Sequence, residues 1–165
     1  MIASMTDVTL RKATQADAGR IRQLVIEGGI NPFGLDWRRF IVAEDLTGRV
    51  IGCVQRKVHK DGSVELASLA VDEIQRGQGV ARALIEALVS IHRGDLYLMC
   101  RSDLEGFYHK FGFQALARDE LPPYFQRIMK VVSWINRITR YSGGPMVMYR
   151  DCGDSEVDRT PHLVG

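Results

Sequence analysis

The sequence predicts a single α/β (α+β) domain with a mixed, mostly antiparallel sheet. Three observations support this prediction. The chain has 165 residues, 45% of them hydrophobic and 25% charged, which suits one domain with its own core. The hairpin signal Asp61-Gly62 joins two strand-like runs, as expected for antiparallel neighbours. Further along, a strand, a helix and a buried strand follow one another, which fits a right-handed parallel crossover.

The first half of the chain predicts one helix and four strands. The weakly alternating run VTLRKA indicates the first strand. Thr14, followed three residues later by Asp17, resembles a capping box, and apolar residues at helical spacing then indicate a helix over 15–27. A break containing Gly and Pro and a short turn or helix at 35–39 come next. A three-stranded meander follows, with the sequences FIVAED, VIGCVQRKVH and VELASLAV.

The second half predicts helices alternating with strands. A helix over 78–92 has Val80, Leu84 and Leu88 on one face, and the apolar run LYLMC after it is a buried strand. The segment LEGFYHKFGF indicates a short helix and FQALARDE a strand. An apolar helix over 124–138 precedes the last strand, PMVMYR, and this helix either covers the sheet or contributes to a homodimer. The total is six to seven strands with four to five flanking helices.

Domain limits follow from composition. Residues 1–151 are expected to form the one domain, and the polar, mixed residues 152–165 a flexible tail. The four histidines are expected mostly at the surface, and none has metal-ligand spacing with another His or Cys, so no metal is predicted.

Charge and hydropathy exclude several classes of function. The net charge of +2, without a basic run of five, argues against a nucleic-acid partner. No stretch approaches the roughly 20 apolar residues of a membrane span, and the start MIASMTD does not resemble an export signal. The three cysteines are an odd number, and two of them lie in apolar strand-like runs, so a cytoplasmic location is expected.

A glycine-containing loop, Arg76-Gly77-Gln78-Gly79, separates a buried strand from an amphipathic helix. Glycine has no Cβ, so a ligand can approach the backbone amides closely. The start of the next helix offers unpaired N–H groups and a positive dipole end, and together these features favour an anion such as phosphate. The alternative is a turn that uses glycine only to change direction.

Three phosphate-binding patterns compete for this loop. The P-loop pattern is missing from the chain. The dinucleotide fingerprint needs a third glycine, but Gly79 is followed by Val80, Ala81 and Arg82. The run RGQGVA fits the third pattern, Arg/Gln-x-x-Gly-x-Gly/Ala, which is the pyrophosphate loop of the GCN5-related N-acetyltransferases.

The chain resembles that family from about residue 7 to residue 150. Besides the loop, LAV at 69–71 resembles the strand beside the acyl-CoA pantetheine arm, and FYHKFGF at 107–113 resembles the family's Tyr-containing segment after the fifth strand. The resemblance implies a sheet splayed between its fourth and fifth strands, with acetyl-CoA in the cleft. It assigns binding of this co-substrate to Leu69, Ala70, Val71, Arg76, Gly77, Gln78, Gly79, Val80, Ala81, Arg101 and Tyr108.

Two residues carry the chemistry that the resemblance implies. Tyr108 aligns with the tyrosine that protonates the departing CoA sulfur, although an aromatic packed in the core is the alternative. Glu65 lies where relatives often carry a base, and the alternative is a strand glutamate that faces water. Arg101 stands where many relatives have Asn, so one CoA contact is expected to differ.

The expected acceptor is a primary amine of a small molecule such as an amino acid. Trp37, Arg38 and Arg39 are candidates for binding an acidic or carboxylate-bearing substrate, and solvated charges beside a core Trp are the alternative. Direct attack in a ternary complex is expected, because neither Cys53 nor Cys100 has a recognisable His partner. A protein lysine or N-terminal acetyltransferase and a non-catalytic acyl-CoA-binding sensor are the alternative functions.

Overall fold

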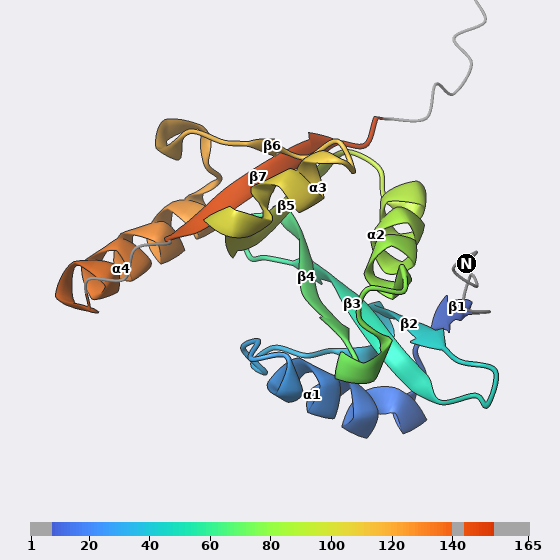
Figure 1. The fold of residues 1–165 in the computed structure, drawn as a ribbon. Helices are drawn as coiled ribbons and strands as arrows, with labels where there is room; N and C mark the ends of the chain where they lie inside the picture. The colour runs from blue at the N-terminus through green and yellow to red at the C-terminus, as the bar shows by residue number, and fades with distance from the viewer. Residues whose placement is uncertain (1–7, 140–143, 154–165) are drawn as a thin grey trace, which may run out of the picture.

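The computed structural model describes residues 8–139 and 144–153, and they form one seven-stranded sheet flanked by helices (Figure 1). The order of the strands is β1-β2-β3-β4-β5-β7-β6. The strands are β1 (Thr9–Lys12), β2 (Phe40–Glu44), β3 (Val50–Val58), β4 (Val64–Val71), β5 (Asp95–Arg101), β6 (Gln114–Ala115) and β7 (Pro145–Asp151). The α-helices are α1 (Ala18–Glu27), α2 (Val80–Ile91), α3 (Glu105–His109) and α4 (Pro123–Thr139). Shorter 3₁₀ turns are η1 (Gln15–Asp17), η2 (Trp37–Arg39), η3 (Glu73–Gln75), η4 (Ser102–Leu104) and η5 (Arg118–Glu120).

The sheet opens between β4 and β5, as predicted. β1 to β4 form an antiparallel half, and β5, β7 and β6 form a second antiparallel half. The parallel strands β4 and β5 meet at one register pair, Glu65 and Tyr97. Figure 1 shows the two strands close at one end and diverging toward the other. Backbone groups beyond the shared pair therefore face a gap between the halves instead of a neighbouring strand.

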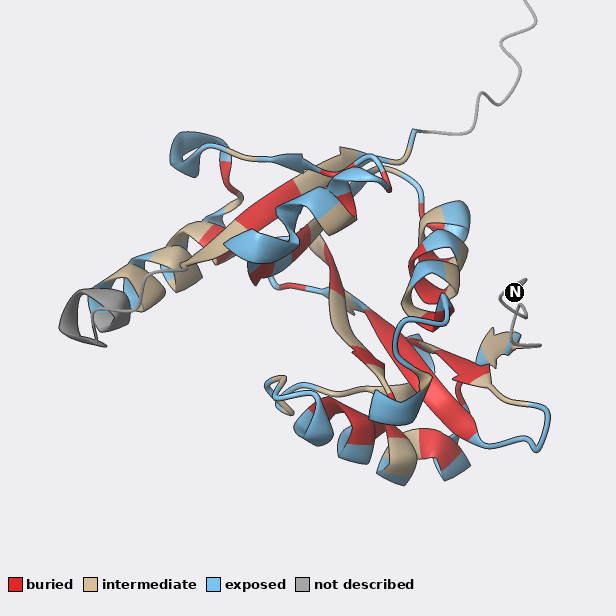
Figure 2. Ribbon diagram, viewed as in Figure 1, coloured by how far each residue is buried: buried red, intermediate tan, exposed pale blue. Residues whose placement is uncertain are grey.

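Two helices cover opposite faces of the first half-sheet. The buried face of α2, with Leu84 and Leu88, packs against β3 residues such as Ile51. The buried face of α1 packs against a separate cluster that includes Phe40 and Val42. Figure 2 shows these buried stripes on both helices and along the strands between them. Each large apolar side chain buried in this way contributes about 1.5–3 kcal/mol, so the first half-sheet is held firmly by packing.

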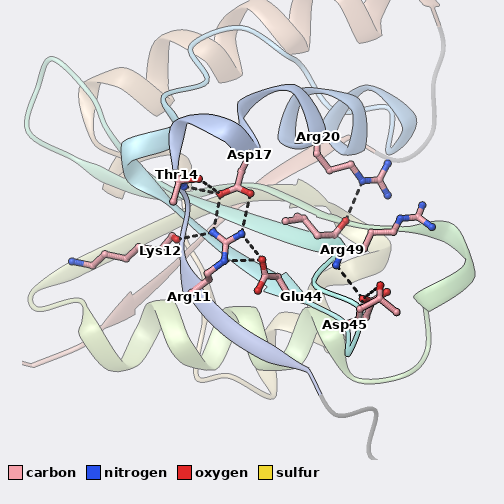
Figure 3. Close-up of polar contacts among 10 residues, drawn as sticks. Arg11, Lys12, Thr14, Asp17, Arg20, Glu44, Asp45 and Arg49 are labelled. Atoms are coloured by element: carbon pink, nitrogen blue, oxygen red, sulfur yellow. Dashed lines mark hydrogen bonds and ion pairs between the residues drawn. The ribbon is translucent and has the colours of Figure 1, made fainter.

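A polar cluster joins β1, β2 and the start of α1 (Figure 3). The guanidinium of Arg11 donates to both oxygens of Asp17, at 2.7 and 2.9 Å, and also to Glu44. Asp17 in addition accepts from the backbone N–H and the hydroxyl of Thr14, at 2.7 and 2.9 Å, so the predicted capping box is confirmed. These hydrogen bonds, first of all those from Arg11, hold the pKa of Asp17 well below its usual range.

The predicted strand at 113–120 and the predicted tail at 152–165 both differ in part from expectation. Of the predicted strand FQALARDE only Gln114–Ala115 forms β6, and the N–H of Leu116 adds one more hydrogen bond, to the Val147 carbonyl at 3.1 Å. Arg118–Glu120 then form η5, where Glu120 accepts from the backbone N–H of Ala117 at 3.1 Å. The predicted tail begins ordered, since Cys152 N–H donates to the Gly94 carbonyl at 3.0 Å. The rest of the tail, residues 154–165, lies outside the described residues.

Within the described ranges, every helix is too short or too polar to span a bilayer.

Candidate active site

A cleft of about 900 Å³ lies where β4 and β5 separate. One side is formed by β4 with Lys57 of β3, and the other by β5 with Leu104 of η4 and Tyr108 of α3. The segment after α1, residues 28–31, and the first half of α4 complete the walls. Residues from both half-sheets therefore share one cavity, a concave site of the kind in which small molecules bind.

β4 is distorted where it lines the cleft. The β3–β4 register shifts between Cys53, opposite Ala70, and Gln55, opposite Ala67, so β4 has one extra residue. Ser68 lies in the resulting bulge, and its φ of 52° is in the left-handed region. Such a bulge locally disrupts the ladder and redirects the strand, and here it turns the backbone near Ser68 toward the cavity that this residue lines. The sequence LASLAV carries no turn signal that marks the bulge.

The predicted pantetheine strand is only partly at the surface of the cleft. Leu69 lines it, whereas Ala70 is buried against the α1 side of the sheet and Val71 packs against the α2 side. The co-substrate contacts expected of Ala70 and Val71 can therefore come only from their backbone groups.

The glycine loop between β4 and α2 is open to solvent on its outer side. Gly77 and Gly79 have φ of 76° and 85°, a region in which other residues are strained. A Cβ at either position would have no other atom within 4 Å, so the space above the loop is free. Gly79 is the N-cap of α2 and gives it no side-chain cap. The first N–H groups of α2, from Val80 and Ala81 onward, are thus available to an anion.

Side chains within and beside the loop fix its shape. Arg76 Nε donates to the Val71 carbonyl at 3.3 Å, and Gln78 Nε2 donates to the Ile74 carbonyl at 3.2 Å. Both predicted loop side chains thus bond to the backbone that precedes the glycines.

Asp72 ties the start of this segment to the body of the domain. Its carboxylate accepts from Arg20 at 2.6 Å and from Arg49 at 2.8 Å, and it also accepts from the N–H of Ile74 at 3.3 Å. The loop is therefore positioned by contacts with α1 and with the turn before β3.

Tyr108 of α3 lies in the wall of the cleft and is 8% exposed. Phe107 and Phe113 surround its ring in edge-on contacts, at 5.1 and 6.2 Å between centroids. Burial raises the pKa of the phenol to about 12, and nearby Cys100 adds to this shift. The hydroxyl therefore keeps its proton at neutral pH and can donate it into the cleft.

Glu65 of β4 also lies in the cleft wall and is buried. One of its oxygens, Oε2, lies 2.7 Å from Nε2 of His59, and the His59 ring stacks on Tyr124 of α4.

The expectation that the histidines lie at the surface is wrong for His59 and for His92, which are 8% and 3% exposed. His59 and Glu65 face each other across the β3–β4 hairpin, and α4 adds Tyr124 to them; the sequence does not reveal this arrangement because it depends on the packing of α4 on the hairpin.

The predicted acceptor residues lie away from the cleft lining. Trp37 packs against the α1 cluster, and the guanidinium of Arg38 lies 4.6 Å from the centre of its ring. Arg38 and Arg39 each form an ion pair with Asp36 at 3.5 Å. Arg101 does line the cleft, where its Nε donates to an Asp103 oxygen at 3.0 Å.

The cysteines near the cleft are not activated as nucleophiles. Burial raises the pKa of Cys53 to about 12 and that of Cys100 to about 11. Both remain thiols at neutral pH, which is the unreactive form. Within the described residues no group of three or more His, Cys, Asp or Glu side chains is arranged to hold a metal ion.

Comparisons with known proteins point to one family. Residues 36–115 match a model described as the acetyltransferase (GNAT) domain. The uncharacterized N-acetyltransferase YhbS of Escherichia coli K12 is 34% identical over 122 residues, which cover 70% of each chain.

Solved structures share the fold at lower identity. Rv2747 of Mycobacterium tuberculosis, solved in complex with CoA, superposes with a TM-score of 0.64 at 21% identity, covering 84% of this chain and 97% of that one. N-acetylglutamate synthase of Neisseria gonorrhoeae, complexed with coenzyme A and N-acetyl-glutamate, gives a TM-score of 0.66 at 20% identity. The match covers 89% of this chain but only 35% of the synthase.

Proposed function

Because the chain belongs to the GCN5-related N-acetyltransferase (GNAT) family, we propose that it acetylates the primary amine of a small molecule that also carries a carboxylate, such as an amino acid. The chain is an acetyl-CoA-dependent N-acetyltransferase. The open β4–β5 gap and the free space above Gly77 and Gly79 fit this co-substrate, whose pantetheine amides and pyrophosphate need backbone partners.

The charged side chains of the cleft support a small acceptor with both an amine and a carboxylate. The charged side chains that line it are Lys57, Glu65 and Arg101, two cations and one anion. A lysine-rich protein segment would need an acidic groove, and this lining does not provide one. Lys57 and Glu65 are register partners on β3 and β4, so their Cβ atoms lie about 5 Å apart on one face. One small molecule can therefore place its carboxylate at Lys57 and its amine at Glu65.

The proposed chemistry divides between the two sides of the cleft. Bound acetyl-CoA supplies the acetyl group as a thioester. Glu65 accepts a proton from the acceptor amine, since an ammonium has no lone pair with which to attack. Tyr108 donates its hydroxyl proton to the sulfur as the carbon–sulfur bond breaks. Amides of the loop at Gly77–Ala81 hold the pyrophosphate, and those near Ser68 stabilise charge that develops on the acetyl oxygen.

The proposal is tested by CoA release with a panel of amines. Free amino acids are expected to react faster than the matching amino-acid amides, and a Lys57→Gln variant should lose this preference. Lys12→Gln, at an exposed end of β1, is the control and should keep it. Equal rates with acids and amides would contradict the carboxylate requirement. Turnover confined to peptides or proteins would favour the protein acetyltransferase, and binding without turnover would favour the sensor.

A further inference from the structure

A buried Glu–His pair lies at the acceptor side of the cleft. Nε2 of His59 and Oε2 of Glu65 are 2.7 Å apart, and the two side chains are 5% and 11% exposed. An ionised carboxylate only accepts hydrogen bonds, so this contact requires a proton on Nε2. Glu65 borders the cavity, whereas His59 lies behind it, outside the cleft lining.

The ring of His59 is held in one orientation by α4. Tyr124 stacks on it with 3.4 Å between centroids and 16° between planes, and Phe125 contacts it edge-on at 5.7 Å. Tyr124 is itself fixed, because its backbone N–H donates to Asp61 of the β3–β4 turn at 2.7 Å. An imidazole packed on two sides cannot turn its Nε2 away from Glu65 without moving α4.

The elements packed against His59 and Glu65 contribute other titratable side chains near the pair. They are Lys57 on β3, Asp61 on the hairpin turn, Tyr97 on β5, opposite Glu65 in the sheet, and Tyr124 on α4. Burial raises the pKa of both tyrosines, so they stay neutral near pH 7. Lys57 and Asp61 are then the charged neighbours, with opposite signs.

We propose that His59 is the positioning residue for the base of this reaction: its Nε2–H holds Oε2 of Glu65 and leaves Oε1 to the acceptor amine. This inference rests on the proposed function. A carboxylate buried without a donor would favour the protonated form, which cannot accept the amine proton. In the reaction the proton passes from the amine nitrogen to Oε1, and His59 keeps its own proton throughout.

The test compares three variants by pH–rate profiles with a reactive amine. His59→Leu removes the donor and is expected to lower kcat/KM for the amine at least tenfold, with the affinity for acetyl-CoA within twofold. The acidic limb of its profile should move to higher pH, because the carboxylate loses the hydrogen bond that favours its ionised form. His59→Gln retains an N–H donor and should restore most of the rate and the position of the limb.

His92→Leu is the matched control, since His92 is equally buried but bonds to Arg56 and to the Asp95 carbonyl. It should leave the acidic limb in place even if it lowers stability. An unchanged limb in His59→Leu, or a His59→Gln variant as slow as His59→Leu, would overturn the positioning role.

A second readout does not need turnover. The Nε2–H of His59 is expected to give a downfield ¹H–¹⁵N signal that exchanges slowly with water in the wild type, and this signal should shift upfield in Glu65→Gln, because the ring loses its anionic acceptor. If the wild type acetylates no amine, the proposed function fails while this shift still reports the pair. If the shift is absent in an active enzyme, the inference fails and the function stands.

Discussion

The phenol of Tyr108 keeps its proton at neutral pH, but transfer of that proton to a free CoA thiolate is thermodynamically unfavourable. Its raised pKa, about 12, ensures that the donor form is present across the neutral range. A thiolate with an ordinary pKa of about 8.5 is a much weaker base than the phenolate that would be left behind. Donation therefore helps only while the carbon–sulfur bond is breaking, and its contribution is expected near the lower end of general acid catalysis.

We predict that Tyr108→Phe lowers kcat about tenfold to a hundredfold and changes the dissociation constant of acetyl-CoA by less than threefold. The ring and its packing remain, so the loss reports the hydroxyl. Steady-state kinetics and calorimetry provide the two values. Tyr149→Phe, which removes a hydroxyl that bonds Asp95 on β5 outside the cleft lining, should leave kcat unchanged. A rate equal to that of wild type in Tyr108→Phe would remove the proton-donor role.

The loop before α2 is the element most sensitive to added negative charge. We predict that Gly79→Asp weakens acetyl-CoA binding at least tenfold, because a carboxylate would lie beside the amides proposed to bind the pyrophosphate. Gly48→Asp is the matched control: its φ of 80° is close to the 85° of Gly79 and its surroundings are equally open, but it lies in the β2–β3 turn. Calorimetry that finds the two variants equally tight would refute the loop assignment.

The two faces of α4 are expected to differ in their effect on the acceptor. Ile128 and Val132 line the cleft, while Val131 is 58% exposed. Ile128→Ala should raise the KM of the amine by roughly 5-fold to 150-fold, since about 1–3 kcal/mol of apolar contact is removed, and should leave acetyl-CoA affinity unaltered. Val131→Ala should change neither. Equal effects of the two substitutions on the amine KM would show that α4 acts through stability rather than contact.

For the whole molecule, the cluster around Arg11 predicts how folding responds to acid. The pKa of Asp17 is depressed in the folded chain, so its contribution to stability is complete above its usual value of about 4 and is lost as the pH falls below it. Asp17→Asn is expected to lower the free energy of unfolding by about 2 kcal/mol at pH 7, or roughly 5 °C in Tm. The difference from wild type should shrink at pH 3 in thermal melts. A gap that stays constant with pH would contradict this assignment.

Sequence patterns were sufficient for features that depend on neighbouring residues. Apolar spacing of 3.6 or 2 residues located the four α-helices and most strands, and Thr14 with Asp17 marked the first helix. Resemblance to a family supplied the splayed sheet and directed attention to Glu65 and Tyr108, which the structure brings to one cleft.

Features created by packing between distant segments could not be predicted in this way. The bulge at Ser68 depends on the register with β3, which no single strand encodes. The burial of His59 depends on α4, whose Tyr124 is 65 positions away in the chain. Composition makes Trp37, Arg38 and Arg39 candidates for binding the acceptor, but it does not show that Arg38 and Arg39 pair locally with Asp36, outside the lining of the cleft.

The described strands β4 and β5 pair only at Glu65 and Tyr97, and the two halves of the sheet are otherwise joined by side chains of one buried core cluster. A molecule inserted beyond that pair contacts both halves, so its binding free energy adds to the work needed to pull them apart. Bound acetyl-CoA is therefore expected to hold the two halves together as well as to react. Calorimetric scans are expected to place the unfolding transition at a higher temperature when the protein is saturated with the co-substrate than when it is alone.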